Sequence, residues 1–99
     1  MSVDKTFCVY MLASKRNGTL YVGVTSNLVQ RVWQHKEGVV DGFAKQHAVK
    51  MFVWYELHES AISAITREKQ IKKWRRAWKV EAVEVANPYW NDLYESIVR

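Results

Sequence analysis

Residues 7–24 read FCVYMLASKRNGTLYVGV, and this stretch decides the fold. Both of its ends, residues 7–13 and 19–24, are apolar and contain the β-branched and aromatic side chains that favour strands. Between them lies Asn17-Gly18, a dipeptide typical of tight turns. The stretch therefore predicts a β-hairpin with two short strands.

The hairpin predicts that two tyrosines share one face of the sheet. A two-residue turn at Asn17-Gly18 places Arg16 opposite Thr19, and side chains alternate between the two faces along each strand. Tyr10 and Tyr21 then point to the same side, and a four-residue loop would keep that parity. Two aromatic core residues explain this spacing as well as two functional phenols do. A buried tyrosine hydroxyl needs a hydrogen-bond partner in either case.

Beyond the hairpin, apolar spacing and turn residues predict one more strand and several helices. In chain order these are a helix that Thr25 or Ser26 caps and Gly38 ends, an irregular loop over 39–48, a strand over 51–57, a helix over 61–74 that Ser60 caps, a helix over 79–85 and a short amphipathic helix or turn within 90–98. The predicted fold class is α/β, with a small, three-stranded, mostly antiparallel sheet flanked by helices.

The composition describes one folded domain with a positive charge. The chain has 99 residues, of which 48% are hydrophobic, so we expect a single core and a single domain over residues 1–99. One cysteine excludes an internal disulfide, and no apolar run approaches the roughly 20 residues of a membrane span. We therefore expect a cytoplasmic protein without a membrane partner. The net charge of +5 favours a polyanionic partner.

Three residues that follow the second tyrosine have the properties of site residues. Gly23 lies inside a strand, where glycine marks a close approach of another group or the end of the strand. Arg31 and His35 are four positions apart, at the edge of a helix's apolar face. Arg31 offers charged, planar donors for a phosphate, or it only extends from the interface. His35 is a site residue or a structural one, and His47 and His58 are expected on the surface.

The long helix carries a carboxylate within its apolar stripe. The apolar members of that stripe follow helical spacing and are Ala61, Ala64, Ile65, Ile71, Trp74 and Trp78. Glu68 occupies the position that is missing from the series. A buried carboxylate must be paired or must bind a cation. Glu68 therefore predicts a metal ligand, and the alternative is an ion pair with Lys72 one turn later.

A dense run of basic residues surrounds Glu68. We call it the basic belt, and it consists of Arg67, Lys69, Lys72, Lys73, Arg75, Arg76 and Lys79. Trp74 and Trp78 are interleaved with it. Such a belt predicts sequence-independent contacts to nucleic-acid phosphates, and the alternative is a solvated helix face.

The order and spacing of these features resemble the GIY-YIG nuclease family over about residues 7–93. The resemblance rests on Cys8-Val9-Tyr10, Tyr21-Val22-Gly23, Arg31, His35 and Glu68. The chain is most similar in layout to small single-domain bacterial members of the UPF0213 type, which look like the nuclease half of the repair protein UvrC standing alone. The resemblance implies the GIY-YIG fold and a metal-dependent DNA endonuclease that hydrolyses phosphodiester bonds, with a possible place in DNA repair or processing.

The resemblance also implies a role for each residue. Tyr21 would be the general base, Tyr10 would hydrogen-bond the attacking water, and Arg31 would bind the phosphate. Glu68 would hold Mg²⁺ or Mn²⁺ on the leaving-group side, and His35 would assist as a nearby polar group or proton carrier.

Two further residues have supporting roles by the same resemblance. Gly23 would leave room beside the tyrosine for metal and phosphate. Asn87, in the sequence Asn-Pro-Tyr-Trp, matches a late asparagine of many family members, and an Asx-type turn before proline explains it equally well.

The departures from the family pattern leave two other functions open. Cys8 and Val9 replace a glycine and an isoleucine, and Val24 stands where the repair nuclease has a lysine. Loss of that cation favours a catalytically weak DNA-binding module of the same fold, and exposed tryptophans would suit a protein-interaction domain. We expect DNA binding without sequence specificity, because so small a domain has few ways to contact base edges. The oligomeric state and the pathway stay open.

Overall fold

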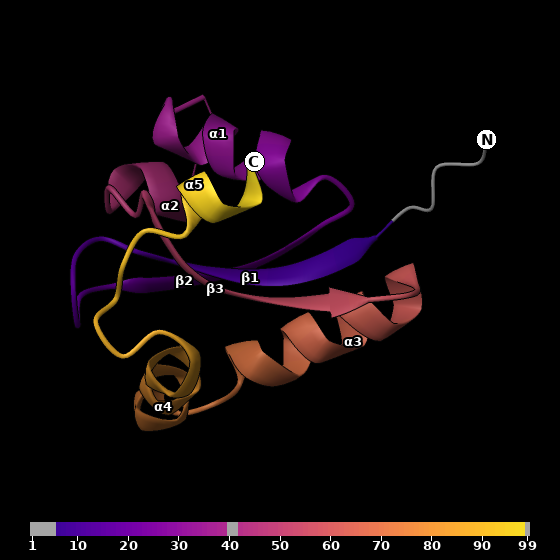
Figure 1. Ribbon diagram of the computed structural model, residues 1–99. Coiled ribbons are helices and arrows are strands. Elements are labelled where there is room, and N and C mark those ends of the chain that lie inside the picture. Colours follow the sequence, from indigo (N-terminus) through magenta and orange to yellow (C-terminus); the bar gives the residue numbers. More distant parts are fainter. Residues whose placement is uncertain (1–5, 40–41, 99) are drawn as a thin grey trace.

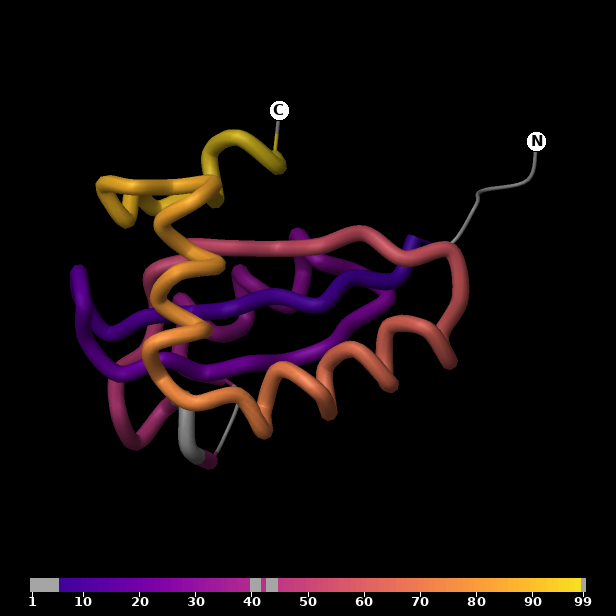
Figure 2. Tube along the Cα trace, turned by 90° about the horizontal axis from the view of Figure 1, so that it is seen from below, coloured from indigo at the N-terminus to yellow at the C-terminus, as the bar shows by residue number. Residues whose placement is uncertain are grey.

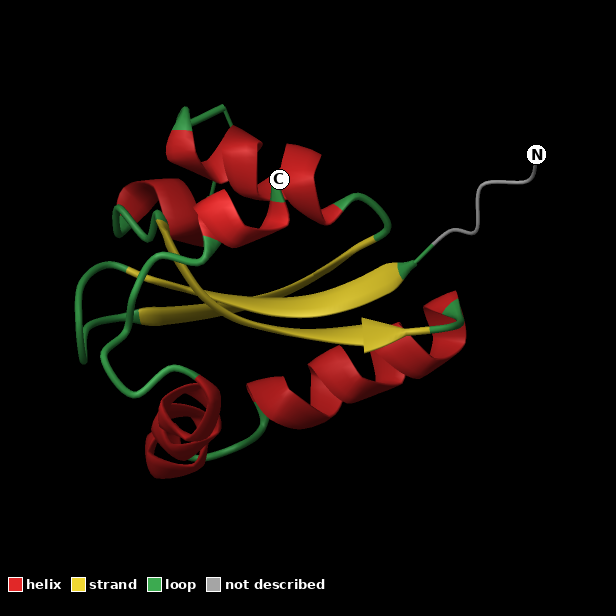
Figure 3. Ribbon diagram, in the orientation of Figure 1, coloured by secondary structure: helices red, strands yellow, loops and turns green. Residues whose placement is uncertain are grey.

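The structure is a computed structural model, and it describes residues 6–39 and 42–98. Its elements in chain order are β1 (Phe7–Ala13), β2 (Leu20–Thr25), α1 (Leu28–Lys36), α2 (Phe43–Gln46), β3 (Met51–His58), α3 (Ala61–Lys72), α4 (Arg76–Ala86) and α5 (Tyr94–Ile97). The predicted α/β class is confirmed, because the three strands form one antiparallel sheet with helices against it (Figures 1 and 3). None of the helices described here has the length and apolar character that crossing a membrane requires.

The sheet has β1 at its centre, in the order β2-β1-β3. Leu12 pairs with Tyr21 across the hairpin, and the last hydrogen bond before the turn runs from Ser14 N to Thr19 O at 3.0 Å. The loop therefore has four residues, and the predicted two-residue turn is wrong. Asn17 adopts a left-handed conformation with φ of 60° within it. Both loop lengths are even, so Tyr10 and Tyr21 share a face of the sheet as predicted.

Helices cover both faces of the sheet. Helices α1 and α5 lie on one face and α3 and α4 on the other, as Figure 1 shows. The face towards α3 and α4 buries the larger cluster, made of Val9, Met11, Ala13, Val22, Val53, Trp54, Ala64, Ile71, Val83 and Trp90. The face towards α1 and α5 buries Tyr10, Leu12, Val32, Val49 and Phe52. Strand β1 supplies alternate residues to the two clusters, so it is buried on both sides.

A β-bulge in β3 interrupts the pairing with β1. Met11 pairs with Trp54 and Leu12 pairs with Phe52, which leaves Val53 as an extra residue. The Val53 carbonyl accepts a hydrogen bond from Asn87 Nδ2 at 3.1 Å. Asn87 also donates to Asn91 O at 2.8 Å, so this predicted supporting residue holds the C-terminal segment against the bulge. These contacts give Asn87 a structural role.

Helix α1 begins one or two residues later than predicted. Its N-cap is Asn27, whose Oδ1 accepts a hydrogen bond from Gln30 N at 3.2 Å. Thr25 Oγ1 accepts a hydrogen bond from Asn27 N at 3.0 Å and so holds this capping residue in place. The prediction that Thr25 or Ser26 caps the helix is therefore wrong. Gly38 follows the helix with φ of 72°, which agrees with its predicted role as a terminator.

Later boundaries differ from the predictions where the chain changes direction. Ser60 caps α3 as predicted, but α3 ends at Lys72 and α4 begins at Arg76. The apolar stripe therefore does not continue to Trp78, which is 50% exposed. Ile65 is also exposed, because it lies about 100° round the helix from buried Ala64. The expected loop over 39–48 includes positions outside the described residues, and its described part contains α2.

Candidate active site

Tyr10 and His35 form a buried polar pair between the sheet and α1. Their side chains share a hydrogen bond of 3.0 Å between Tyr10 Oη and His35 Nε2. Tyr10 is 1% exposed and His35 is 4% exposed. The hydrogen bond satisfies the hydroxyl that a tyrosine on this face needs. Only two residues separate the end of β2 from the start of α1, and this short connection places His35 of α1 against Tyr10.

Tyr21 joins this pair from the neighbouring strand. Its ring centroid lies 6.3 Å from that of Tyr10 and 5.4 Å from that of His35. A side-chain hydrogen bond also links the two tyrosines. Tyr21 is half-buried, so it is the member of the aromatic cluster that reaches towards solvent. We call Tyr10, Tyr21 and His35 the tyrosine cluster.

Gly23 makes room for the Tyr10 side chain. The two residues pair across the strands, and a Cβ added to Gly23 would lie 2.5 Å from both Cζ and Oη of Tyr10. No real Cβ approaches another group so closely, so Tyr10 could not keep this position over any other residue. The resemblance implied space for metal and phosphate at this glycine. In the structure the tyrosine itself fills that space.

Burial and a nearby arginine keep the cluster neutral. Burial raises the pKa of Tyr10 far above its usual value, and the neighbouring Tyr21 raises it further. Burial lowers the pKa of His35, and the positive charge of Arg31 lowers it again. The half-buried Arg31 also opposes the rise in the pKa of Tyr10, so its charge acts on both groups. Near neutral pH, Tyr10 is therefore a protonated phenol and His35 a neutral imidazole.

Glu68 approaches from the opposite layer of the molecule. It is 8% exposed, as its place in the apolar stripe predicted, and it lies on α3 rather than on the face that carries the tyrosines. Ala61 and Ile65, on the same flank of α3, line a hollow together with Val24 of the edge strand β2. The negative charge of Glu68 is one of the smaller causes of the raised pKa of Tyr10. The carboxylate therefore influences the tyrosine although the two residues come from different layers.

The Glu68 carboxylate has a cation beside it already. Lys72 Nζ lies 2.6 Å from Glu68 Oε2, which is the ion pair that the sequence offered as the alternative to a metal. No group of three or more histidine, cysteine or acidic side chains suited to a metal occurs within residues 6–39 and 42–98. The donor set is thus one carboxylate, which suits Mg²⁺ because this ion keeps several waters and takes other ligands from a phosphate. The Lys72 side chain is 51% exposed and can move away.

Comparison with known proteins decides the family. Residues 6–81 match the sequence profile of the GIY-YIG catalytic domain. The chain belongs to the GIY-YIG family. A UPF0213 protein of Staphylococcus haemolyticus is 32% identical over 76 residues, which cover 77% of this chain and 92% of that protein. A UPF0213 protein of Vibrio parahaemolyticus is 30% identical over 84 residues, which cover 85% of this chain and 78% of that protein.

The same likeness extends to a solved structure. The solution NMR structure of a UPF0213 protein from Bacillus halodurans covers 87% of this chain and 92% of its own, with 25% identity and a TM-score of 0.52. The resemblance to the GIY-YIG nuclease family and to its UPF0213 members is therefore confirmed.

In this GIY-YIG domain the side chains of the basic belt contact several different residues. Arg67 pairs with Glu56 of β3, Lys72 pairs with Glu68, and Arg76 Nη2 donates to Asn17 O at 2.7 Å. The sequence offered the Lys72–Glu68 pair, but it could not show the partners of Arg67 and Arg76, which are distant along the chain. Arg75 stacks on Trp78 with its guanidinium 4.8 Å from the ring centroid. The remaining members are two exposed lysines and one half-buried lysine, namely Lys69, Lys73 and Lys79.

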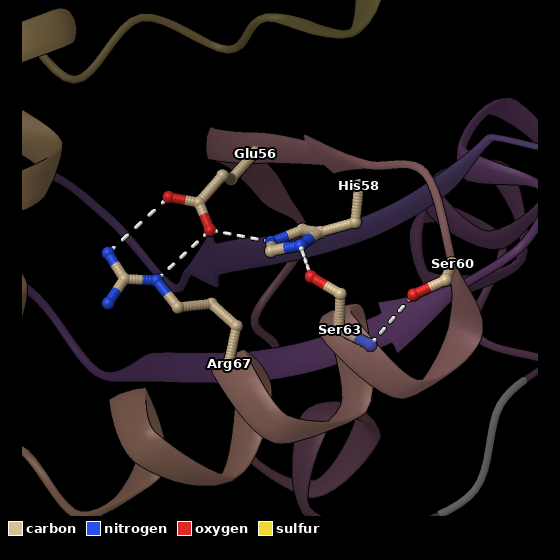
Figure 4. Close-up of polar contacts among 5 residues, drawn as sticks. All are labelled: Glu56, His58, Ser60, Ser63 and Arg67. Carbon is tan, nitrogen blue, oxygen red and sulfur yellow. Dashed lines mark hydrogen bonds and ion pairs between the residues drawn. The ribbon is translucent and has the colours of Figure 1, made fainter.

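Sequence reasoning missed a second polar network on the GIY-YIG domain, which Figure 4 shows. His58 Nε2 lies 2.7 Å from Glu56 Oε1, and His58 Nδ1 lies 2.6 Å from Ser63 Oγ. Arg67 Nε donates to Glu56 Oε1 at 3.0 Å. His58 was expected on the surface; it is half-buried there, and the sequence did not predict these partners. The available signal was the spacing of Glu56 and His58, because residues two apart on a strand share a face.

Proposed function

We propose that this GIY-YIG domain is a metal-dependent endonuclease that hydrolyses phosphodiester bonds in DNA. The observation that supports it most is the buried Tyr10–His35 hydrogen bond beside the half-buried Tyr21, within a domain of a nuclease family. Hydrolysis requires a base for water, a cation for the phosphate and stabilisation of the leaving oxygen. Each of these needs has a candidate residue around the tyrosine cluster.

Tyr21 is the proposed general base. Its phenol reaches towards solvent, where water and substrate can meet it, while Tyr10 is buried and stays protonated. The hydrogen bond between the two hydroxyls lets Tyr10 act as the donor, and a donated hydrogen bond stabilises negative charge on the acceptor oxygen. Tyr10 therefore orients Tyr21 and supports charge on it. This refines the role that the resemblance implied, in which Tyr10 held the water.

His35 and Arg31 have separate tasks in this proposal. The neutral His35 holds the Tyr10 hydroxyl through Nε2 and so fixes the phenol above Gly23. Arg31 carries a permanent charge whose field reaches both Tyr10 and His35. A guanidinium in that position can bind the scissile phosphate through paired N–H donors.

Glu68 is the proposed ligand for Mg²⁺ or Mn²⁺. Its carboxylate is nearly buried, and the half-exposed Lys72 that now neutralises it can be exchanged for another cation. A divalent ion held there would supply positive charge to the phosphate and the leaving oxygen. DNA as the substrate, the lack of sequence specificity, a cytoplasmic location and a role in repair remain parts of this proposal.

The Glu68–Lys72 ion pair also supports a second candidate function, a DNA-binding module with little turnover. In that case Glu68 is satisfied by Lys72 and needs no metal. Val24 in place of the repair nuclease's lysine favours the same candidate, since a phosphate-binding cation is missing.

Nicking of supercoiled plasmid separates the two candidates. With Mg²⁺ or Mn²⁺ the wild type is expected to nick the plasmid, and Glu68→Gln is expected to abolish nicking while DNA affinity is retained. Thermal melts without metal should show an unchanged or raised Tm for Glu68→Gln, because a buried charge is removed. Glu59→Gln, a change at an exposed carboxylate just before α3, is the matched control. Unchanged nicking together with a lower Tm for Glu68→Gln would assign Glu68 to the structural ion pair.

A further inference from the structure

A groove on the α3–α4 side of the sheet takes no part in the proposed reaction. It has a volume of about 590 Å³, and its walls include Trp54, Arg67, Trp74, Trp78, Glu81 and Val85. These residues come from β3, from α3 and α4, which meet at a corner on this face of the sheet (Figure 2), and, for Trp74, from the turn between the two helices. The volume lies within the range of about 300–1,000 Å³ that is typical of small-ligand sites.

Three tryptophans, Trp54, Trp74 and Trp78, line this groove. Trp54 is 9% exposed, whereas Trp78 is 50% exposed. The rings of Trp74 and Trp78 are nearly perpendicular, at 80°, with centroids 6.4 Å apart. Exposed aromatic surface on one side of a small domain is costly in water and marks an interaction site more often than a scattered apolar residue does.

The charges divide the groove into an apolar interior and a cationic rim. Among the lining residues, Arg67 is already paired with Glu56 and stacked on Trp74 at 5.1 Å, and the exposed Glu81 adds a negative charge. The interior therefore does not favour a phosphate. Beside the groove, the exposed Arg75 lies over the Trp78 ring, and the exposed Lys73 directly precedes Trp74 in the sequence. A ligand with an aromatic part and an anionic part matches this division.

We infer that the groove binds unpaired bases of a single-stranded nucleic-acid segment, whose phosphates lie along Lys69, Lys73 and Arg75. Base stacking on aromatic side chains beside a basic surface is the usual way in which proteins bind single strands. Paired bases are stacked inside the duplex and cannot enter. The inference rests on the proposed function for its choice of nucleic acid as the ligand.

The position of the groove connects it with the proposed catalytic residues. Arg67 pairs with Glu56 of β3 on one flank of α3. Glu68 lies about 100° further round the helix, on the side of Ala61 and Ile65, which line a hollow with Val24 of β2. Lys69 and Lys73 are on the outer surface of α3 or at its end, between these flanks. A strand that leaves the tyrosine cluster can therefore cross α3 over these lysines and reach Trp78. The expected substrate is a duplex with a single-stranded tail or branch.

Binding of matched strands tests this inference. Fluorescence anisotropy compares a labelled oligothymidine with an abasic strand of the same length, which keeps the phosphates and lacks the bases. The wild type is expected to bind the strand with bases about tenfold more tightly. Trp78→Ala should remove most of this difference, and Trp78→Phe should keep part of it. Trp33→Ala, at a tryptophan of similar exposure on α1, is the control and should keep all of it.

Several results would overturn the inference. Equal wild-type affinity for the two strands would show that phosphates alone are bound, and an equal loss for Trp33→Ala would show that the effect is not local. A dimer in sedimentation that Trp78→Ala dissociates would assign the groove to self-association. Plasmid nicking with base-independent binding would remove this inference and leave the proposed function in place. Failure to bind any strand or duplex, together with failure to nick, would remove both.

Discussion

Two histidines of this domain contact hydroxyl groups in opposite surroundings. His35 is buried against the Tyr10 phenol, and burial with Arg31 nearby keeps its ring neutral. His58 contacts Ser63 at the surface and shares the Glu56 carboxylate with Arg67 (Figure 4). The first site depends on close packing of uncharged groups, and the second depends on attraction between charges that water and salt can weaken. The stability of the His35 site should therefore depend on packing and pH, and that of the His58 site should depend on ionic strength.

The largest expected effect tests the packing at the buried site. Gly23→Ala should lower the free energy of unfolding by about 2–3 kcal/mol, because its Cβ would overlap the Tyr10 ring and force it to move. Urea unfolding measures this loss. In a Tyr10→Leu background, which removes the atoms that clash, the same change should cost less than about 1 kcal/mol. An equal cost in both backgrounds would place the strain in the backbone of β2 and not at the phenol.

Loss of the Tyr10 hydroxyl should have a smaller effect. Tyr10→Phe leaves His35 Nε2 buried without its partner, so we expect a loss of about 1–2 kcal/mol in the free energy of unfolding. This loss should be the same at low and high salt, since neither group is charged. Tyr89→Phe, at a tyrosine that is 71% exposed, is the control and should be neutral. A salt-dependent loss for Tyr10→Phe would contradict a neutral pair.

Acid should destabilise the buried site through His35. Because the pKa of His35 is lowered in the folded state, the unfolded chain binds a proton first as the pH falls. The stabilisation is therefore complete above the usual pKa near 6.5 and decreases below it, by at most about 1.4 kcal/mol per pH unit. Chemical unfolding between neutral and acid pH should show this slope, and His35→Gln should remove it. His47→Gln, the same change at an exposed histidine, is the matched control.

The surface network should show the smallest effect and the strongest dependence on salt. Glu56→Gln removes the charge that Arg67 and His58 share, but both Glu56 and Arg67 are about one-third exposed. We expect a loss below about 1 kcal/mol in dilute buffer, which becomes negligible at high salt. Thermal melts across a salt series check this. A loss as large as that of Tyr10→Phe, or one that salt does not change, would show that the two histidine sites do not differ as proposed.

The comparison also shows which features the sequence could predict. The shared face of Tyr10 and Tyr21, the cap at Ser60 and the burial of Glu68 follow from spacing within one hairpin or one helix, and the structure agrees with each. The Arg67–Glu56 ion pair and the bulge at Val53 join segments that are distant along the chain, and no local pattern specifies them.

Gly23 and the end of α3 illustrate the same limit. The sequence marked Gly23 as a place of close approach, but the approaching group is Tyr10, which only the register of two strands could identify. The apolar spacing predicted a stripe that continues to Trp78. Spacing alone does not indicate that the chain turns after Lys72.

The contact between Asn87 and the bulge begins a C-terminal segment that is synthesised late and holds an early part of the fold. After Asn87 the chain passes the open edge of β3, where Leu93 N donates to Phe52 O at 2.7 Å, and it then reaches α1 through a Lys36–Asp92 ion pair. Helix α1 carries Arg31 and His35, yet this brace lies after residues 6–81, the part that matches the family profile. During synthesis on a ribosome, α1 therefore emerges well before the residues that hold it in place.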